Sequence, residues 1–316
     1  MRGLLGLGLL AFAAPLRAEP STLPPEVGYG YSEVETARSA AMGGALRAFS
    51  NSTEALQINP ANLAATRVYH MAGLAQFWSG ANRQSYGAAI VDSVVSRSRL
   101  AGGLSATWLF QDPDGVDRRS LDLRFALAFP LSDRFLVGAS GRLLDLKQDG
   151  FPREQGLLPP SVASSGLEGE SVVKAVTVDA GVTIRPSGNL AVSFVGNNLT
   201  DPGHSLLPLT FGGGIGFGSQ LLTVEADIVA DVTTYDESKV RVMGGAEVLA
   251  AGQYPLRLGY RFDEGRESHA LSGGVGYTSR EFAFDFSLRR VFGGDSATAI
   301  FFGLKYHVES LGISGE

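Results

Sequence analysis

The sequence contains no cysteine, so an exported form of this chain has no disulfide framework, and its stability must come from the fold itself. A basic excess is also missing, because the formal net charge is −6. Acidic and basic residues are mixed along the chain without a long run of either sign. Nucleic-acid binding needs a basic face, so the sequence predicts no nucleic-acid partner.

Long apolar runs are missing after residue 16. Residues 3–16 are apolar, follow Arg2 and precede small residues, which is typical of a secretory signal peptide. We expect Ala18 to be the last residue removed, with Ala13 as a second candidate, so that residues 1–18 form the signal peptide. No later run approaches the ~18 residues that indicate a membrane-spanning helix. The mature chain is therefore not expected to cross a membrane with helices, and a soluble secreted or periplasmic protein stays an alternative.

A period of two dominates the sequence from residue 67 onward. Within residues 282–288, Phe and Leu occupy every second position, and Ala, Asp and Ser lie between them. The pattern recurs in residues 121–129, 222–228, 256–262 and 300–308. Such alternation gives each strand one apolar and one polar face. Soluble sandwiches also alternate, but segments of about 10–13 residues with Phe, Leu and Tyr on one face favour the longer strands of a membrane barrel.

The fold class we predict is all-β, a transmembrane antiparallel barrel of about fourteen strands over residues 67–308. The strands are expected at residues 67–78, 82–93, 98–110, 119–129, 133–147, 171–184, 188–197, 207–217, 219–230, 238–249, 252–263, 268–278, 281–291 and 297–308. Connections such as 130–132 are short, whereas 111–118 and 148–170 are long. Outer-membrane barrels have short periplasmic turns and long outer loops. The expected location is therefore the bacterial outer membrane, with its lipid as a partner.

Residues 19–66 break this pattern. Residues 32–48 are rich in Ala, Glu and Arg and predict one short helix or two, and residues 51–64 show no period of two. The segment contains too much polar backbone to lie in lipid. We expect it to form a hatch in or under the lumen of the barrel. Residues 309–316 remain as a C-terminal tail.

Two elements of this segment carry a family resemblance. Residues 37–45 read Ala-Arg-x-x-Ala-Met-Gly-Gly-Ala, and residues 59–64 read Asn-Pro-Ala-x-Leu-Ala. They resemble the N-terminus of the FadL superfamily of outer-membrane barrels, including its PorV-like branch. The hatch motif of this chain would be Met42, Gly43, Gly44, Asn59, Pro60 and Ala61. The chain departs from the family at Asn51-Ser52, where an acidic residue is common, and in its tail beyond the last strand.

The resemblance implies a 14-stranded barrel whose N-terminal hatch lies inside the lumen. It also implies uptake of hydrophobic small molecules through a channel gated by the hatch, as in FadL. The alternative, from the PorV-like branch, is a structural or protein-secretion and attachment role with a secreted protein as partner. The two departures leave the branch open.

Charges of both signs fall on the face predicted to line the lumen. They are Asp122, Arg124, Arg142, Asp179, Glu225, Asp227, Arg241, Glu247, Arg257, Arg261, Asp285, Arg289 and Lys305. A charge turned to lipid would cost ~2–4 kcal/mol at the membrane midplane, which favours the inward face. These side chains either form a salt-bridge network that holds barrel and hatch, or line a polar path for a solute. The outward face is predicted to carry part of an aromatic girdle: Phe135, Tyr254, Tyr277, Phe282 and Tyr306.

No motif for covalent chemistry stands out. Residues 212–218 (GGGIGFG) resemble a phosphate loop, but neither Lys-Ser/Thr nor a helix follows, so a strand facing a crowded lumen is favoured. The sequence has four histidines, His70, His204, His269 and His307. They have no metal-ligand spacing. No nucleophile elbow occurs either. The sequence therefore predicts no enzyme, no metal and no cofactor.

Overall fold

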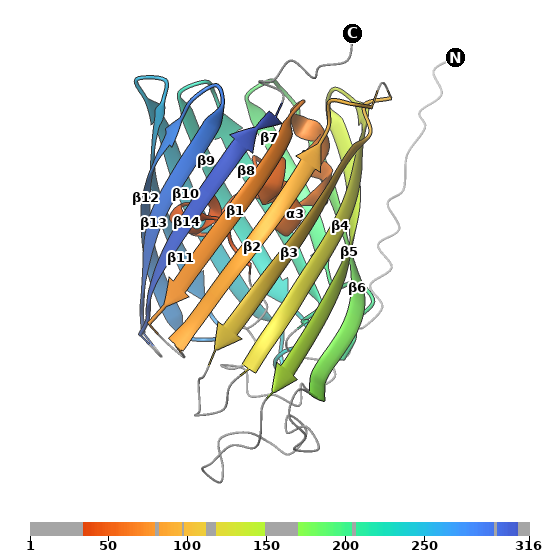
Figure 1. The fold of residues 1–316 in the computed structure, drawn as a ribbon, viewed down its shortest axis with the longest axis vertical. Helices are drawn as coiled ribbons and strands as arrows, with labels where there is room; N and C mark the ends of the chain where they lie inside the picture. Colours follow the sequence, from red (N-terminus) through yellow and green to blue (C-terminus); the bar gives the residue numbers. More distant parts are fainter. Residues whose placement is uncertain are drawn as a thin grey trace, which may run out of the picture.

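Fourteen antiparallel strands close into a barrel in which β1 pairs with both β2 and β14 (Figure 1). The computed structural model describes residues 34–79, 82–96, 98–111, 118–148, 170–203, 207–293 and 296–308. The predicted signal peptide, residues 19–33, most of the long connection after residue 148, and the tail 309–316 lie outside the described residues. Among those described, the predicted all-β barrel and its strand number are confirmed.

The strands follow the predicted ranges closely. They are β1 Tyr69–Trp78, β2 Arg83–Asp92, β3 Ala101–Gln111, β4 Arg118–Ser132, β5 Phe135–Gln148, β6 Glu170–Ile184, β7 Leu190–Asn197, β8 Thr210–Gly218, β9 Leu222–Asp231, β10 Lys239–Ala250, β11 Tyr254–Asp263, β12 Ser268–Thr278, β13 Phe282–Phe292 and β14 Thr298–His307. The boundaries differ where turns take residues from strands. The predicted strand 219–230 begins only at Leu222, because the N–H of Ser219 donates to the carbonyl of Leu222 and closes a tight turn.

The two ends of the barrel differ in their connections. One end, at the top of Figure 1, carries tight turns such as residues 133–134 and 279–281, and we name it the short-turn end. The opposite end carries the longer connections, including 198–209 and 232–238, and is named the long-loop end. This asymmetry is the one predicted from the sequence and is typical of outer-membrane barrels.

The outer face of the barrel is apolar and exposed. Leu258 of β11, Val176 of β6 and Phe194 of β7 are 67%, 69% and 59% exposed. A water-soluble protein rarely exposes so extended an apolar surface. Because a closed barrel also leaves no unpaired strand edge, the molecule is built to span a bilayer with its strands.

Aromatic side chains border this apolar face near both ends. Tyr254, Tyr277 and Phe282 contact one another near the short-turn end, with ring centroids 5.6 and 5.7 Å apart. Tyr306 is exposed near the same end, whereas Phe135 is half-buried. Trp108 and Phe110, which the prediction omitted, are exposed on the outer face toward the long-loop end.

The N-terminal segment, residues 34–65, lies inside the ring of strands (Figure 1). It contains the helices α2 (Ala37–Ala41) and α3 (Ser52–Ile58) and the 3-10 helix η1 (Pro60–Ala65). None of the helices among the described residues is long and apolar enough to cross a membrane.

Its helices agree with the expectation of one or two short helices within residues 32–48 and include a further one at residues 52–58. Within 32–48 only the five-residue α2 forms in the described part, because Gly43 and Gly44 turn the chain away with φ of 70° and 92°. Thr36 caps its start through a capping box with Ser39. The helix at 52–58 was not predicted.

Candidate functional site

Inward-facing glycines of the barrel wall form the surface against which the N-terminal segment packs. A Cβ atom at Gly259 of β11 would lie 2.1 Å from the backbone nitrogen of Gly43. One at Gly245 of β10 would lie 2.5 Å from the carbonyl oxygen of Met42. On the other side of the lumen, Gly138 of β5 meets the backbone of Ala61 in the same way. Both halves of the predicted hatch motif therefore touch the wall with their backbone, and only glycine leaves room for this approach.

The glycine-rich run of β8 also makes room for the N-terminal segment. Its inward positions, Gly212 to Gly218 in steps of two, face the side chains of Arg47 and Phe49. The prediction that residues 212–218 form a strand rather than a phosphate loop is confirmed. The run is glycine-rich on its inner face because the segment fills the space that larger side chains would need.

We expect Gly259→Ala to loosen the segment without opening the barrel. The added methyl group would overlap backbone atoms of residues 41–43, which cannot move aside as a flexible side chain would. Amide hydrogen exchange of residues 40–46 should become faster. Gly141→Ala is the matched control, because a Cβ on that strand glycine meets nothing within 4 Å. Equal exchange in both variants would contradict the contact.

Two carboxylates of β9 hold the turn that follows α2. Asp227 accepts hydrogen bonds from the N–H groups of Leu46 and Arg47, each at 3.0 Å. Glu225, two positions away on the same face, accepts from the N–H groups of Ala48 and Phe49. The Arg47 guanidinium also lies 3.1 Å from Asp227. Consecutive backbone donors are thus satisfied by side chains of the wall, as buried donors require.

Asn59 organises the junction between α3 and η1. Its side-chain oxygen accepts from the N–H of Ala61 at 3.1 Å, and Pro60 occupies the first turn of η1. Its amide nitrogen donates to the carbonyl of Arg47 at 2.8 Å and to Thr183 of β6 at 3.0 Å. The side chain that caps the helix therefore also ties the segment to the wall.

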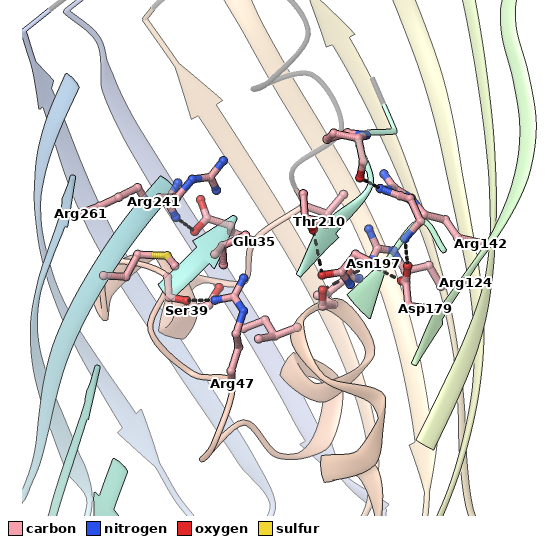
Figure 2. Close-up of a pocket in the computed structure, with 18 residues that line it drawn as sticks. Glu35, Ser39, Arg47, Arg124, Arg142, Asp179, Asn197, Thr210, Arg241 and Arg261 are labelled. Atoms are coloured by element: carbon pink, nitrogen blue, oxygen red, sulfur yellow. Dashed lines mark hydrogen bonds and ion pairs between the residues drawn. The ribbon is translucent and has the colours of Figure 1, made fainter. Parts of the chain in front are cut away.

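A cluster of charges on β4, β5 and β6 lies across the lumen from α2 (Figure 2). Asp122 contacts the Arg142 guanidinium at 2.6 Å and that of Arg124 at 3.1 Å. Asp179 accepts from the N–H of Asn198 at 2.7 Å. Arg124 reaches the segment by donating to the carbonyl of Gln57 at 3.3 Å. This cluster is mainly a network within the wall.

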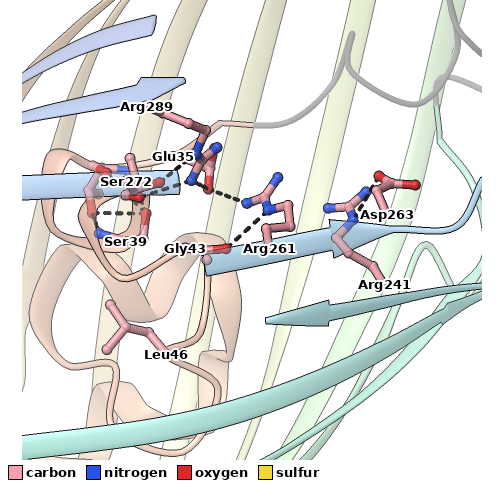
Figure 3. A network of polar contacts seen from close by, with 12 residues as sticks. Glu35, Ser39, Gly43, Leu46, Arg241, Arg261, Asp263, Ser272 and Arg289 are labelled. Atoms are coloured by element: carbon pink, nitrogen blue, oxygen red, sulfur yellow. Dashed lines mark hydrogen bonds and ion pairs between the residues drawn. The ribbon is translucent and has the colours of Figure 1, made fainter. Parts of the chain in front are cut away.

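The ion pairs of Glu35 fasten the start of the segment to β11 and β13 (Figure 3). Its Oε1 lies 2.7 Å from Nη2 of Arg261 and 2.9 Å from Nη2 of Arg289. Its Oε2 contacts Nη1 of Arg289. The same arginines donate to backbone carbonyls, Arg261 to Gly43 at 3.0 Å and Arg289 to Ala40 at 3.1 Å. One carboxylate of the segment is therefore shared by two guanidinium groups of the wall.

A second ionic network lies toward the short-turn end. Arg38 of α2 donates to Glu247 at 2.9 and 3.0 Å, and Arg257 bridges Glu247 and Asp285 at 2.5 Å each. Nearby, Glu54 of α3 pairs with Lys305 of β14 at 3.3 Å. Burial raises the pKa of the Glu54 carboxyl, but Lys305 and Arg38 outweigh it and hold that pKa below its usual range. Glu54 is therefore ionised at neutral pH.

The predicted lumen charges thus fall into separate groups. Glu225 and Asp227 hold the turn at 46–49, whereas Arg241 pairs with Asp263 at 3.3 Å on the wall. The sequence-based prediction missed every partner on the segment, namely Glu35, Arg38, Arg47 and Glu54. It also missed Asp263, which a count of alternating positions from Arg257 would have found.

Two polar cavities lie on opposite sides of the segment. Toward the long-loop end, a cavity of about 130 Å³ lies between Glu35, Ser39 and Arg47 and the wall cluster of Arg124 and Arg142 (Figure 2). Toward the short-turn end, a cavity of about 340 Å³ is lined by Arg38 and other polar residues of the wall. The segment occupies the space between them.

Apolar space lies outside the lumen. A groove of about 870 Å³ runs over the outer face from β14 across β1 to β6, where Gly73, Ala88 and Ala106 make the surface hollow. A small internal cavity of about 30 Å³ shares Ala72, Gly73 and Ala89 with this groove. The wall is therefore thin at this place, although the pairing of β1 with β2 continues through it.

Metal ligation finds no support in the described part of the chain. No three His, Asp or Glu side chains among those residues lie close enough together to hold a metal ion. His70 and His307 stack at 4.4 Å, His70 is hydrogen-bonded to Ser52, and His269 is bonded to Tyr260 on the outer face. The fourth histidine of the sequence, His204, lies outside the described residues.

The architecture defines a class: a 14-stranded transmembrane barrel of the outer-membrane type with an N-terminal segment inside its lumen. No protein-family model matches the chain, and no curated protein matches it. Solved structures do. The CymD monoaromatic hydrocarbon channel aligns with a TM-score of 0.68 at 16% identity, covering 88% of this chain and 98% of that one.

Two further solved structures align over nearly their whole length. The Pseudomonas putida toluene transporter TodX has a TM-score of 0.57 at 15% identity, covering 87% of this chain and 98% of TodX. A Pseudomonas aeruginosa FadL homologue has a TM-score of 0.56 at 14% identity, covering 86% and 97%. The chain thus has the FadL-type fold that its sequence resembles. The fold agrees with the predicted bacterial outer-membrane location.

Proposed function

We propose that this protein is an outer-membrane channel for hydrophobic small molecules, and that residues 34–65 gate it. The position of the segment between two cavities carries the proposal. A solute crossing the lumen would have to displace the segment, since it contacts β1 to β6 on one side and β11 to β14 on the other. The solute class is supported by the similar structures, which are described as hydrocarbon and toluene channels. No covalent chemistry is involved.

The two halves of the segment are held differently, and this suggests which half moves. Residues 52–65 pack Leu56 and Leu63 into an apolar cluster with Val91 and small residues of β3 and β4. Residues 34–49 are held by ion pairs and hydrogen bonds to β9, β10, β11 and β13. Their apolar clusters with the wall are smaller, with Ala37 and Ala40 against Phe301 and Ala45 against Met243. Water that enters the lumen can replace polar contacts, whereas opening a packed apolar cluster exposes apolar surface to that water. We therefore assign the gating movement to residues 34–49, with residues 52–65 as the fixed base.

A reversible cross-link tests the gate. A Cβ at Gly303 of β14 would lie 3.7 Å from the Cβ of Ala37 in α2, which suits a disulfide. Because the chain has no cysteine of its own, the pair Ala37→Cys and Gly303→Cys can form only the intended bond within one molecule. Oxidised protein should fail to admit labelled toluene into intact cells that display it, and reduction should restore uptake.

The two single-cysteine variants are the controls for this experiment. Each should transport like the unmodified protein under oxidising and reducing conditions. Transport that continues at the same rate in the fully oxidised pair would show that α2 does not gate the route. Loss of transport in a single variant would instead indicate that the substitution itself disturbs the packing of α2 against the barrel wall.

A further inference from the structure

Two carboxyl groups of β9 lie side by side beneath the turn at residues 46–49. Glu225 and Asp227 are two residues apart on the inward face, and only 2% and 3% of their surfaces are exposed. Their carboxyl groups are within hydrogen-bond distance of each other. A Cβ on Gly214 of β8 would touch Oδ1 of Asp227 and lie 3.1 Å from Oε1 of Glu225. These two oxygens therefore meet over the glycine.

Three of the four oxygens of this carboxyl pair have donors from the segment. Oε1 and Oε2 of Glu225 accept from the N–H groups of residues 48 and 49, and Oδ2 of Asp227 accepts from those of residues 46 and 47. The fourth oxygen, Oδ1 of Asp227, is buried and has no donor among the described residues. Leaving a buried acceptor without a donor is costly. A proton on Oε1 of Glu225 would supply that donor.

The surroundings of the pair supply one positive charge. The Arg47 guanidinium lies 3.1 Å from Asp227, and it is the only cation in contact with either carboxyl group in the described part of the chain. The cross-strand neighbours of the pair are uncharged, namely Gly214 and Gly216 on β8 and Met243 and Gly245 on β10. The next inward charges of β10 are Arg241, which pairs with Asp263, and Glu247, which pairs with Arg38 and Arg257. Two adjacent carboxylates in a buried site repel each other, which favours one shared proton.

We propose that Glu225 and Asp227 share one proton, and that this proton fastens the turn at residues 46–49 to the wall. Oε1 of Glu225 carries the proton and donates it to Oδ1 of Asp227. When the proton is lost to water, the two carboxylates repel each other and must be solvated. Water then enters between β9 and the turn and replaces its backbone donors. The proposal adds regulation by pH to the gate assigned to residues 34–49, and only its consequence for transport rests on that gate.

The sign of the pH dependence follows from the proton count. With the turn attached, the pair holds one proton. With the turn released, water solvates both carboxyl groups, and in water they are ionised above about pH 5. Release of the turn therefore frees one proton, and a difference of one proton changes the equilibrium by up to about tenfold per pH unit. Acid favours attachment, and rising pH weakens it.

Hydrogen exchange of the purified full-length protein tests the proposal without transport. Protection factors of the amides at residues 46–49, which are corrected for the intrinsic pH dependence of exchange, would be measured between about pH 5 and pH 8. In the unmodified protein they should fall by up to about tenfold per pH unit over part of this range. In Glu225→Gln they should be lower, because one oxygen is left to accept, but they should not change with pH.

Asp231→Asn is the matched control. Asp231 is an inward carboxylate of the same strand, but it binds Thr233 and Thr234 instead of the segment. This variant should show the pH dependence of the unmodified protein. Heat-modifiable migration on a gel would verify that all variants form closed barrels.

Two results would overturn the shared proton. Protection factors of residues 46–49 that are independent of pH in the unmodified protein would show that release frees no proton. The same pH dependence in Glu225→Gln would place the titrating group elsewhere. Transport that continues in the oxidised cysteine pair would refute the gate alone and would leave this measurement unaffected.

Discussion

A barrel that lacks residues 32–64 should insert into a membrane and conduct ions in a planar bilayer far better than the intact protein. The wall does not need the segment for closure, because every strand pairs with two neighbouring strands. A barrel of this strand number encloses more space than its own side chains fill, and its inward glycines enlarge that space. Water would enter and solvate the charges that the segment now covers, so the barrel should tolerate the deletion.

Single-channel recording gives the measurement. The intact protein in the same bilayer is the reference, and heat-modifiable migration shows that the shortened chain has closed its barrel. A shortened barrel that conducts no more than the intact one would mean that the segment does not obstruct the lumen. In that case the gating role proposed for residues 34–49 would also fail.

Glu35→Gln should be among the most harmful single substitutions in the segment. The variant keeps the shape of the side chain but removes the negative charge shared by Arg261 and Arg289. Both arginines are largely buried. The deletion would let bulk water reach them, but the substitution leaves the segment in place and keeps bulk water out. Removing one partner of a buried ion pair typically costs about 3–5 kcal/mol. Hydrogen exchange of residues 36–46 should accelerate accordingly.

Asp133→Asn provides the comparison for Glu35→Gln. Asp133 pairs with Arg99 at 2.9 Å, but the two side chains are 87% and 50% exposed. Exposed pairs contribute about 0–1 kcal/mol, so this variant should leave exchange in residues 36–46 unaltered. If Glu35→Gln behaves like Asp133→Asn, the contacts of Glu35 do not hold the segment in place.

The sequence predicted the barrel well because each strand obeys a strong local rule. A residue such as Leu258 must face lipid, and its neighbours Arg257 and Gly259 must then face the lumen, so the period of two records the fold directly. The lipid-facing surface follows from the same rule, whereas the register between strands also depends on the turns that join them. Errors appeared only at strand ends, where a turn residue such as Ser219 forms hydrogen bonds of its own.

The contacts inside the lumen were far less predictable. Glu35 precedes α2 and Arg38 lies within it, and this helix of five residues is too short for a period to show which way either side chain points. Their partners lie on strands in the second half of the sequence. Helix α3 forms where the chain is shielded by the wall, so tertiary contacts support it more than its own propensity does. The resemblance to the FadL superfamily implied an inserted N-terminus, but it could not supply the pairing of individual charges.

The separation in sequence between the segment and its partners has a consequence for the order of assembly. Glu35 is 254 residues from Arg289, Glu54 is 251 from Lys305, and the N–H groups at residues 46–49 bind carboxylates 176–181 residues later. Such distant contacts form only after the chain between them has been organised. The part of the protein made first is therefore the last to find its place, since the carboxylates and guanidiniums that receive it exist as a site only once β9 to β14 are in register. Until then its unsatisfied donors must remain in water, and the lumen must stay hydrated while the barrel closes.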